Sequence, residues 1–312
     1  MDWQQLIDII TKPDNIPIVL LAIVVPFYTW YALRQSFAND RLIESLEADP
    51  KAAKTAHRKV QPHEEGWDQK VHVWPYLLRI EFLAAIIVMV ILTVWSIAFD
   101  APLEEPANPN LTMNPSKAPW YFLGLQEMLV YFDPWIAGVM MPTLIIVGLM
   151  VIPYCDVNPL GNGYYTLKQR KFAIGIFLFG FIVLWCVLIF IGVFIRGPGW
   201  MWFWPGETWD HHRINNETFV HLPHLVGLYE DKSPVPTMLF GLVVLTGFVA
   251  GTAWVIHKLY TKYKPIEYSK MNIVQYATMQ FFLITMLAMP VKILIWHVWR
   301  IKYVLITPWF NI

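Results

Sequence analysis

Six long apolar segments constrain the fold of this chain more than any other feature of its sequence. Each holds about the 20 predominantly apolar residues that an α-helix needs to cross a bilayer. The first is interrupted by Pro26, and the last contains Pro290 and Lys292. The sequence therefore predicts an all-α polytopic membrane protein with about six transmembrane helices. The segments cover residues 16–33, 76–99, 135–154, 172–195, 237–257 and 273–296.

The composition agrees with a membrane protein and excludes several other classes. Hydrophobic residues make up 56% of the chain and charged residues 15%, against about 45–50% and about 25% in soluble domains. The 23 basic and 23 acidic residues balance, so nothing favours nucleic acid as a partner. Cys155 and Cys186 are too few for an iron–sulfur cluster and are expected to be packing residues. Residues 1–15 lack a basic start and a cleavage site, so no removable signal peptide is expected.

Lysine and arginine residues predict the orientation. They gather in loops 34–75, 155–171 and 258–272, which lie on one side if the six segments alternate, and cytoplasmic loops carry such an excess. Loops 100–134 and 196–236 and both chain ends then lie on the opposite, positive side, although the tail that follows residue 296 is itself basic. We expect a multi-pass protein of a prokaryotic inner (cytoplasmic) membrane.

The loop between the second and third segments combines a proline-rich stretch with a short helix-forming stretch. Its stretch "PANPNLTMNPSKAP" contains four prolines and cannot be helical. Residues 119–132 can form a short helix, with Pro119 in the first turn, where a missing N–H costs nothing. A short interfacial helix is therefore expected here.

Two motifs in this loop resemble a known family. "PANP" at 106–109, followed by "PWYF" at 119–122 between two membrane segments, resembles the quinol-oxidation loop of cytochrome b. "VWPYLLRIEFL" at 73–83 resembles the start of the first helix in the C-terminal half of that family. The chain is similar to the C-terminal half of a split cytochrome b, such as subunit IV of a b6f complex. The resemblance divides it into an extra N-terminal helix and loop (1–71), the cytochrome b-like region (72–258) and an extra C-terminal helix with its tail (259–312).

The resemblance implies a membrane subunit of a quinol:cytochrome c (or similar acceptor) oxidoreductase that is not catalytic alone. Its cofactor would be quinone or quinol, oxidised on the positive face with proton release. Its partners would be a haem-binding subunit like the N-terminal half of cytochrome b, a Rieske iron–sulfur protein and a c-type cytochrome, in a dimeric complex. Paired histidines for two haems are absent, so the b haems are expected on the partner. His72, His257 and His297 lie at segment ends and are expected to be packing residues.

One departure from the family concerns the catalytic carboxylate. Aligning Trp120 and Tyr121 with the family motif places Pro119 where the family has a glutamate. Glu127 is the nearest replacement, seven residues after Trp120 and about 10 Å along a helix, and it is predicted to take the quinol's proton. The alternative is that Glu127 pairs with Lys117 or is solvated. The expected quinol-pocket residues besides Glu127 are Pro119, Trp120, Tyr121, Leu125 and Gln126, with Gln126 able to bond a quinone carbonyl.

A quinone-reduction site is expected on the cytoplasmic face. Arg79 and Glu81 lie near that end of the second segment, and Glu81 aligns approximately with a family aspartate that contacts quinone. The alternative is that Arg79 extends to the surface and neutralises Glu81.

The loop after residue 195 is rich in aromatic residues and histidines. Its alternating tryptophans are typical of a membrane interface. Its histidines are expected to be ordinary loop residues rather than metal or haem ligands, and no metal site is predicted. They are His211, His212, His221 and His224.

Two other function classes remain open at this point. A quinol-dehydrogenase membrane anchor of a different fold predicts quinone binding at one face and no Rieske partner. A secondary transporter predicts inverted repeats and broken helices around a site at the membrane midplane. A neighbouring chain with a four-helix bundle of paired histidines would select the cytochrome b reading over both.

Overall fold

The computed structural model describes residues 3–49, 51, 73–100, 103, 106–158, 160, 164–214 and 218–312. Nearly all regular structure in this part of the chain is helical, and backbone pairing is limited to isolated bridges. The expected all-α polytopic fold is therefore confirmed. The α-helices are α1 (Trp3–Thr11), α2 (Ile16–Ala48), α4 (Leu78–Ala98), α5 (Trp120–Tyr131), α6 (Met141–Cys155), α7 (Leu167–Leu178), α8 (Val187–Phe194), α9 (Pro234–Tyr263), α10 (Pro265–Lys270) and α11 (Ile273–Trp299).

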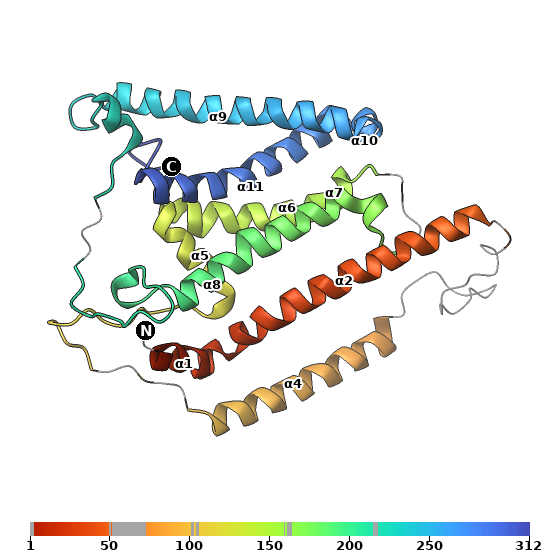
Figure 1. The fold of residues 1–312 in the computed structure, drawn as a ribbon, viewed down its shortest axis with the longest axis horizontal. Coiled ribbons are helices and arrows are strands. Elements are labelled where there is room, and N and C mark those ends of the chain that lie inside the picture. Colours follow the sequence, from red (N-terminus) through yellow and green to blue (C-terminus); the bar gives the residue numbers. More distant parts are fainter. Residues whose placement is uncertain are drawn as a thin grey trace.

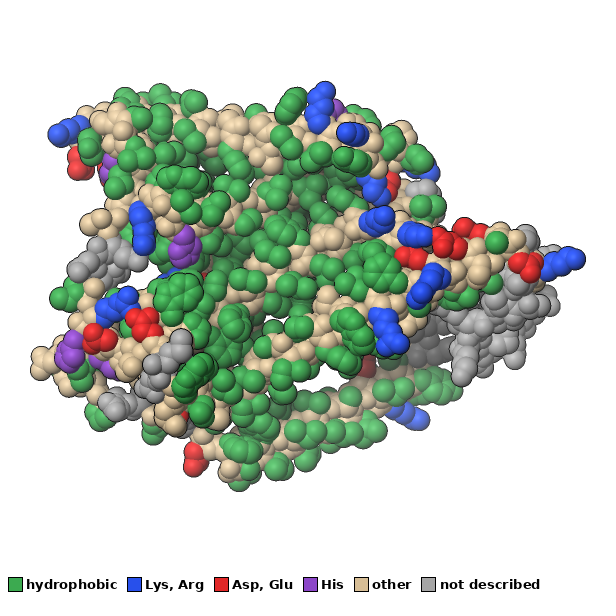
Figure 2. Space-filling model, in the orientation of Figure 1, with side chains coloured by type: hydrophobic (Ala, Val, Ile, Leu, Met, Phe, Trp, Pro, Cys, Tyr) green, Lys and Arg blue, Asp and Glu red, His purple; other side chains and the backbone are tan. Residues whose placement is uncertain are grey.

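Six helical stretches in the described residues are long and apolar enough to cross a membrane, as predicted. Side chains of the apolar classes cover the middle of the molecule, and charged side chains gather toward its two ends (Figure 2). This distribution is what a bilayer core with two aqueous sides requires. The stretches are Pro13–Ala48, Val73–Ala98, Ile136–Cys155, Leu167–Phe194, Pro234–Tyr263 and Ile273–Trp299.

The first membrane helix is longer than the sequence indicated. Residues 34–48 were expected to be loop, but they continue α2. Their polar side chains are used against a neighbouring segment: Asn39 donates to the Tyr165 carbonyl at 2.9 Å, and Asp40 accepts from the Lys168 N–H at 3.2 Å. The prediction of a loop was wrong because these partners lie far away in the sequence. The basic residues Lys54, Arg58, Lys59 and Lys70, as well as His72, Glu104 and Glu105, lie outside the described residues.

The helices alternate in direction, so the loops collect at two ends (Figure 1). At one end Lys168 pairs with Glu44, and Gln275 donates to the Tyr154 carbonyl at 2.7 Å. These contacts place residues within or next to all three basic loops at the same end. At the other end the Thr112 N–H donates to the His211 carbonyl at 3.2 Å, which joins loops 100–134 and 196–236. The tail after α11 lies at this second end, where the Val220 N–H donates to the Arg300 carbonyl at 3.0 Å.

The most buried part of the chain lies around α5. One cluster of buried residues joins α5 to α11 through Met128, Tyr131 and Trp296. A second joins α5 to α8 and the N-terminal helices through Leu123 and Ile189. By contrast, α4 has no buried residue, and it lies apart from the other helices along the outer side of α2 (Figure 1). The short interfacial helix is therefore the centre of the packing.

Candidate functional site

Helix α5 forms where the prolines of the preceding loop end. Pro119 has an extended ψ of 147° and stands just before Trp120, the first helical residue. Its carbonyl accepts the Phe122 and Leu123 N–H groups at 2.8 and 3.1 Å, which starts the helix. The short helix predicted over 119–132 is thus present, one residue shorter at each end.

A close approach to α8 fixes the position of α5. Leu123 of α5 packs against Ile189 and Val193 of α8. Gly192 permits this contact, because a Cβ at that position would lie 2.9 Å from the Leu123 Cγ atom. The helix therefore cannot slide away from α8 without opening the buried cluster.

Glu127 forms a buried ion pair with Arg196, which follows α8. The Arg196 Nη2 atom lies 2.7 Å from Glu127 Oε1, and Arg196 Nε donates to the two carboxylate oxygens at 3.1 and 3.0 Å. The Glu127 side chain is 0% exposed and that of Arg196 is 4% exposed. Breaking such a pair leaves an uncompensated buried charge.

Two further donors complete the surroundings of the carboxylate. Tyr131 OH donates to Glu127 Oε1 at 2.8 Å, and Trp200 Nε1 donates to Oε2 at 3.2 Å. Burial and the neighbouring Glu127 charge raise the pKa of Tyr131, so its hydroxyl keeps its proton. The same hydroxyl lies 3.2 Å from His297 Nε2 on α11. The carboxylate thus connects α5 with the segment that follows α8 and, through Tyr131, with α11.

These contacts decide between the alternatives for the partner of Glu127. Its ion-pair partner is Arg196 and not Lys117, and its side chain is not solvated. Proton transfer by Glu127 stays a prediction. The sequence analysis missed Arg196 as a partner, because it lies 69 residues from Glu127. The sequence did contain one signal for this pair: Arg196 directly follows the predicted segment 172–195, and Glu127 shortly precedes the segment 135–154.

Lys117 is half-buried beside this network but bonds elsewhere. Its Nζ atom donates to the Val193 carbonyl and lies 5.7 Å from the centre of the Trp209 ring. Burial lowers the pKa of Lys117 to about 8, and the nearby charge of Lys12 acts in the same direction. Burial therefore disfavours the charged ammonium form of Lys117 in the folded protein.

This cost predicts a pH dependence of stability. The pKa of Lys117 is about 8 when folded, against 10.5 for the free side chain. Between these values the unfolded chain binds more protons, so stability should rise with pH, by up to about 1.4 kcal/mol per unit. Below about pH 8 both states are protonated and the contribution is flat. Lys117→Met should remove this rise from melting curves of the purified protein at pH 8 to 10. Lys232→Met, which changes an exposed lysine, should keep it; a rise that persists in Lys117→Met would refute the assignment.

The other predicted wall residues differ in exposure. Pro119, Trp120 and Tyr121 are exposed, and the two rings meet edge to face, 5.6 Å apart. Leu125 is half-buried against the α5–α11 cluster. Trp120, Tyr121 and Leu125 thus lie on α5 and Pro119 stands just before it, with Pro119 and the two rings exposed.

Gln126 bonds the loop that precedes α5. Its Oε1 atom accepts the Ala118 N–H at 2.7 Å, and its Nε2 atom donates to the Ser116 carbonyl at 2.8 Å. Both ends of the amide are thus occupied by backbone. A hydrogen bond from Gln126 to a quinone carbonyl would require one of them to open.

The quinone-reduction site predicted on the cytoplasmic face shows no comparable network of contacts among the described residues. Arg79 and Glu81 are both exposed on α4. Among the described residues no ion pair joins them, so the alternative in which Arg79 neutralises Glu81 is not observed. Their role in quinone reduction remains a prediction.

The loop histidines contact protein groups. His211 Nδ1 lies 2.7 Å from the Thr112 carbonyl, and His224 Nε2 lies 2.6 Å from Glu230 Oε2. Burial lowers the pKa of His221, which stacks on Tyr303. Within the described residues no three His, Cys, Asp or Glu side chains are grouped as a metal site would need. His257, farther along, lies 2.9 Å from the Tyr276 hydroxyl.

The fold and these contacts define a polytopic all-α membrane protein with a polar network at one membrane edge. Comparison with known families identifies the part that carries this network. Residues 106–195 match the family model described as cytochrome b(C-terminal)/b6/petD. The resemblance to the C-terminal half of cytochrome b is thereby confirmed over this segment, and it supports a role in electron transport as part of a membrane oxidoreductase. The match includes α5 to α8 and leaves out α4, α9 and α11. No solved structure matches the chain.

Proposed function

We propose that this chain is a membrane subunit of a cytochrome b-type quinol oxidoreductase, and that residues 106–131 form part of a quinol-oxidation pocket. The observation that carries the proposal is the order of elements: a PANP loop and α5 stand between two membrane helices. The family match begins at the first residue of the PANP motif. Oxidation at this edge would release protons to the positive side.

The residues of α5 suit a flat, mostly apolar ligand. The outward rings of Trp120 and Tyr121 offer an aromatic wall beside Pro119, and such surfaces bind ring systems. Leu125 supports this wall from the protein side, and Gln126 holds the loop in place. When bound, a quinol supplies two electrons and two protons; the chain's own residues orient it and receive a proton.

We further propose that Glu127 receives this proton. Donor groups of Arg196, Tyr131 and Trp200 occupy both of its oxygens, so one of them must move away before a quinol hydroxyl can approach. Trp200 makes the longest of the hydrogen bonds to the Glu127 carboxylate, 3.2 Å, and ends a short 3-10 helix, Pro198–Trp200. Displacement of Trp200 would open Oε2 to the pocket while Arg196 stays in place. Arg79 and Glu81 are proposed to serve quinone reduction at the cytoplasmic face.

The remaining partners follow from the resemblance, and one feature of the fold supports them. Beyond Arg79 and Glu81 in its first turn, helix α4 is predominantly apolar, and it buries no residue against its own chain. It therefore offers a free surface to a haem-binding subunit that carries the b haems. We propose a Rieske iron–sulfur protein and a c-type cytochrome as electron acceptors, in a dimeric complex of a prokaryotic inner membrane.

The test is purification of the tagged chain with its native partners. We expect a co-purifying subunit with b-haem absorption and quinol-dependent reduction of that haem, lowered by Trp120→Ala without loss of the partner. Trp254→Ala, on an exposed face of α9, is the matched control. A purified complex that lacks b haem would exclude the proposal. Quinone binding without an iron–sulfur partner would favour a membrane anchor, and solute uptake without electron transfer a transporter.

A further inference from the structure

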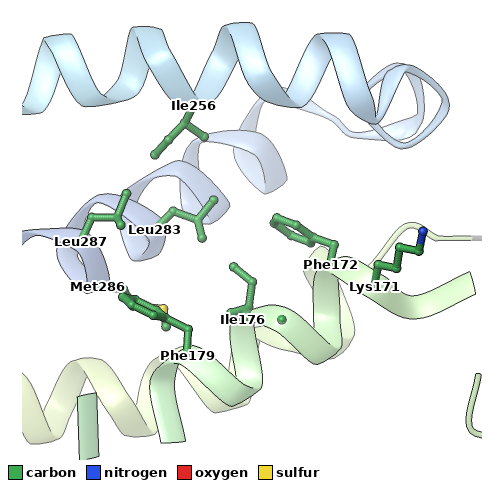
Figure 3. A pocket seen from close by; sticks show the side chains of 9 residues that line it. Lys171, Phe172, Ile176, Phe179, Ile256, Leu283, Met286 and Leu287 are labelled. Atoms are coloured by element: carbon green, nitrogen blue, oxygen red, sulfur yellow. The ribbon is translucent and has the colours of Figure 1, made fainter. Parts of the chain in front are cut away.

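A groove between α7, α9 and α11 lies away from the site described above. It has a volume of about 340 Å³, within the range of small-molecule sites. Its wall is formed by apolar side chains and one glycine, with a single cation, Lys171. Figure 3 shows side chains from the three helices pointing into a common space. The lining residues are Lys171, Phe172, Gly175, Ile176, Phe179, Ile256, Leu283, Met286 and Leu287.

The groove runs from the basic end of the molecule toward its apolar middle. Lys171 stands near the start of α7, and Phe179 lies eight residues further on, about 12 Å deeper along the helix. The Lys171 amine lies at the outer edge and points away from the apolar side chains (Figure 3). A ligand that fits this shape has a charged group at the surface and an apolar chain below it.

The charges around the rim favour an anion. At this end Glu44 pairs with Lys168, Asp156 with Arg170 at 2.6 Å, and Glu267 with Lys264 at 2.7 Å. Among the described residues, Lys171 has no such acidic partner. Basic positions between membrane helices on the cytoplasmic side are typical sites for anionic lipid headgroups.

The deep wall favours an acyl chain. Lys171 is the one polar side chain in the lining, so nothing deeper could bond a buried polar group, whose burial without a partner is costly. Gly175 leaves the wall open, since a Cβ there would meet no atom within 4 Å. An alkyl chain needs no hydrogen bond and can occupy this space.

We propose that the groove binds an anionic phospholipid, with one acyl chain along Gly175 and Phe179 and the phosphate near Lys171. This inference is independent of the proposed quinol chemistry. The lipid would fill the space that α7 leaves between α9 and α11.

The test uses the full chain, purified with its native partners, stripped of lipid and then offered phosphatidylglycerol or phosphatidylethanolamine. Bound lipid is counted by native mass spectrometry. We expect the wild type to retain phosphatidylglycerol in preference. Lys171→Gln should reduce the preference about fivefold, the equivalent of about 1 kcal/mol for one lysine near anionic lipid. Gly175→Phe, which fills the groove, should abolish retention.

Two variants serve as controls. Gly247→Phe adds the same ring at an exposed glycine of α9 with no atom within 4 Å of a Cβ, and Lys258→Gln removes an exposed cation; both should behave as wild type. Equal retention of the two lipids by the wild type would overturn the proposal, as would unchanged retention in Gly175→Phe. Loss of co-purified quinone from Gly175→Phe with phosphatidylglycerol still bound would reassign the groove to a quinone.

Discussion

Glu127→Gln is expected to lower the free energy of unfolding by about 3–5 kcal/mol, the usual effect of removing one partner of a buried ion pair. The amide keeps the shape of the side chain but leaves Arg196, which is 4% exposed, without a counter-charge. Arg196→Gln should cost a similar amount, because it leaves the carboxylate uncompensated. Thermal or denaturant unfolding of the purified protein measures both effects.

The double variant separates the structural role of Glu127 from a chemical one. Glu127→Gln with Arg196→Gln buries no unpaired charge, so we expect much of the lost stability to return. If Glu127 also accepts the quinol's proton, the double variant should be assembled and yet oxidise quinol far more slowly than wild type. Restored stability with near-normal turnover would leave Glu127 a purely structural role.

The exposed pair Arg213–Glu207 provides the matched control. Its atoms are 3.0 Å apart, but its side chains are 42% and 40% exposed. Surface pairs contribute about 0–1 kcal/mol, so Glu207→Gln should change stability little. Equal losses in Glu207→Gln and Glu127→Gln would contradict the argument from burial.

The contrast between local and distant contacts explains what the sequence could predict. The membrane helices are local apolar runs, so their number and order followed from the positions of those runs in the sequence. The end of α2 did not, since its polar residues 34–48 resemble a loop until Asn39 and Asp40 meet residues 165 and 168. Secondary structure that depends on partners more than 100 residues away leaves little local signal.

The candidate site follows the same rule. A carboxylate inside an apolar helix marked Glu127 as unusual, and the PANP and PWYF motifs placed it beside a predicted quinol pocket. The surrounding geometry came from elsewhere: Arg196 and Trp200 lie beyond α8, and His297 lies on α11. The hydrogen bonds of Gln126 to the backbone of the preceding loop could not be predicted either. The sequence does not indicate whether a glutamine side chain will bond backbone groups or a ligand.

Gly192→Val is expected to displace α5 and with it the whole network. A Cβ alone would lie 2.9, 3.3 and 3.4 Å from the Cγ, Cδ2 and Cδ1 atoms of Leu123, and valine adds two methyl groups. Overpacking of this kind costs about 1–3 kcal/mol. A shift of about 1 Å at a reacting group can also lower the rate about 100-fold, so we expect quinol oxidation to fall further than stability does.

A compensating change tests whether this contact is the cause. Leu123→Ala removes the atoms that a side chain at residue 192 would strike, so adding it to Gly192→Val should restore part of both stability and turnover, although Leu123→Ala alone is destabilising because it opens a cavity. Gly138→Val is the matched control, since Gly138 is exposed and a Cβ there would meet no atom within 4 Å. If both valine variants lose activity equally, or if Leu123→Ala gives no recovery, the approach of α5 to α8 does not position the site.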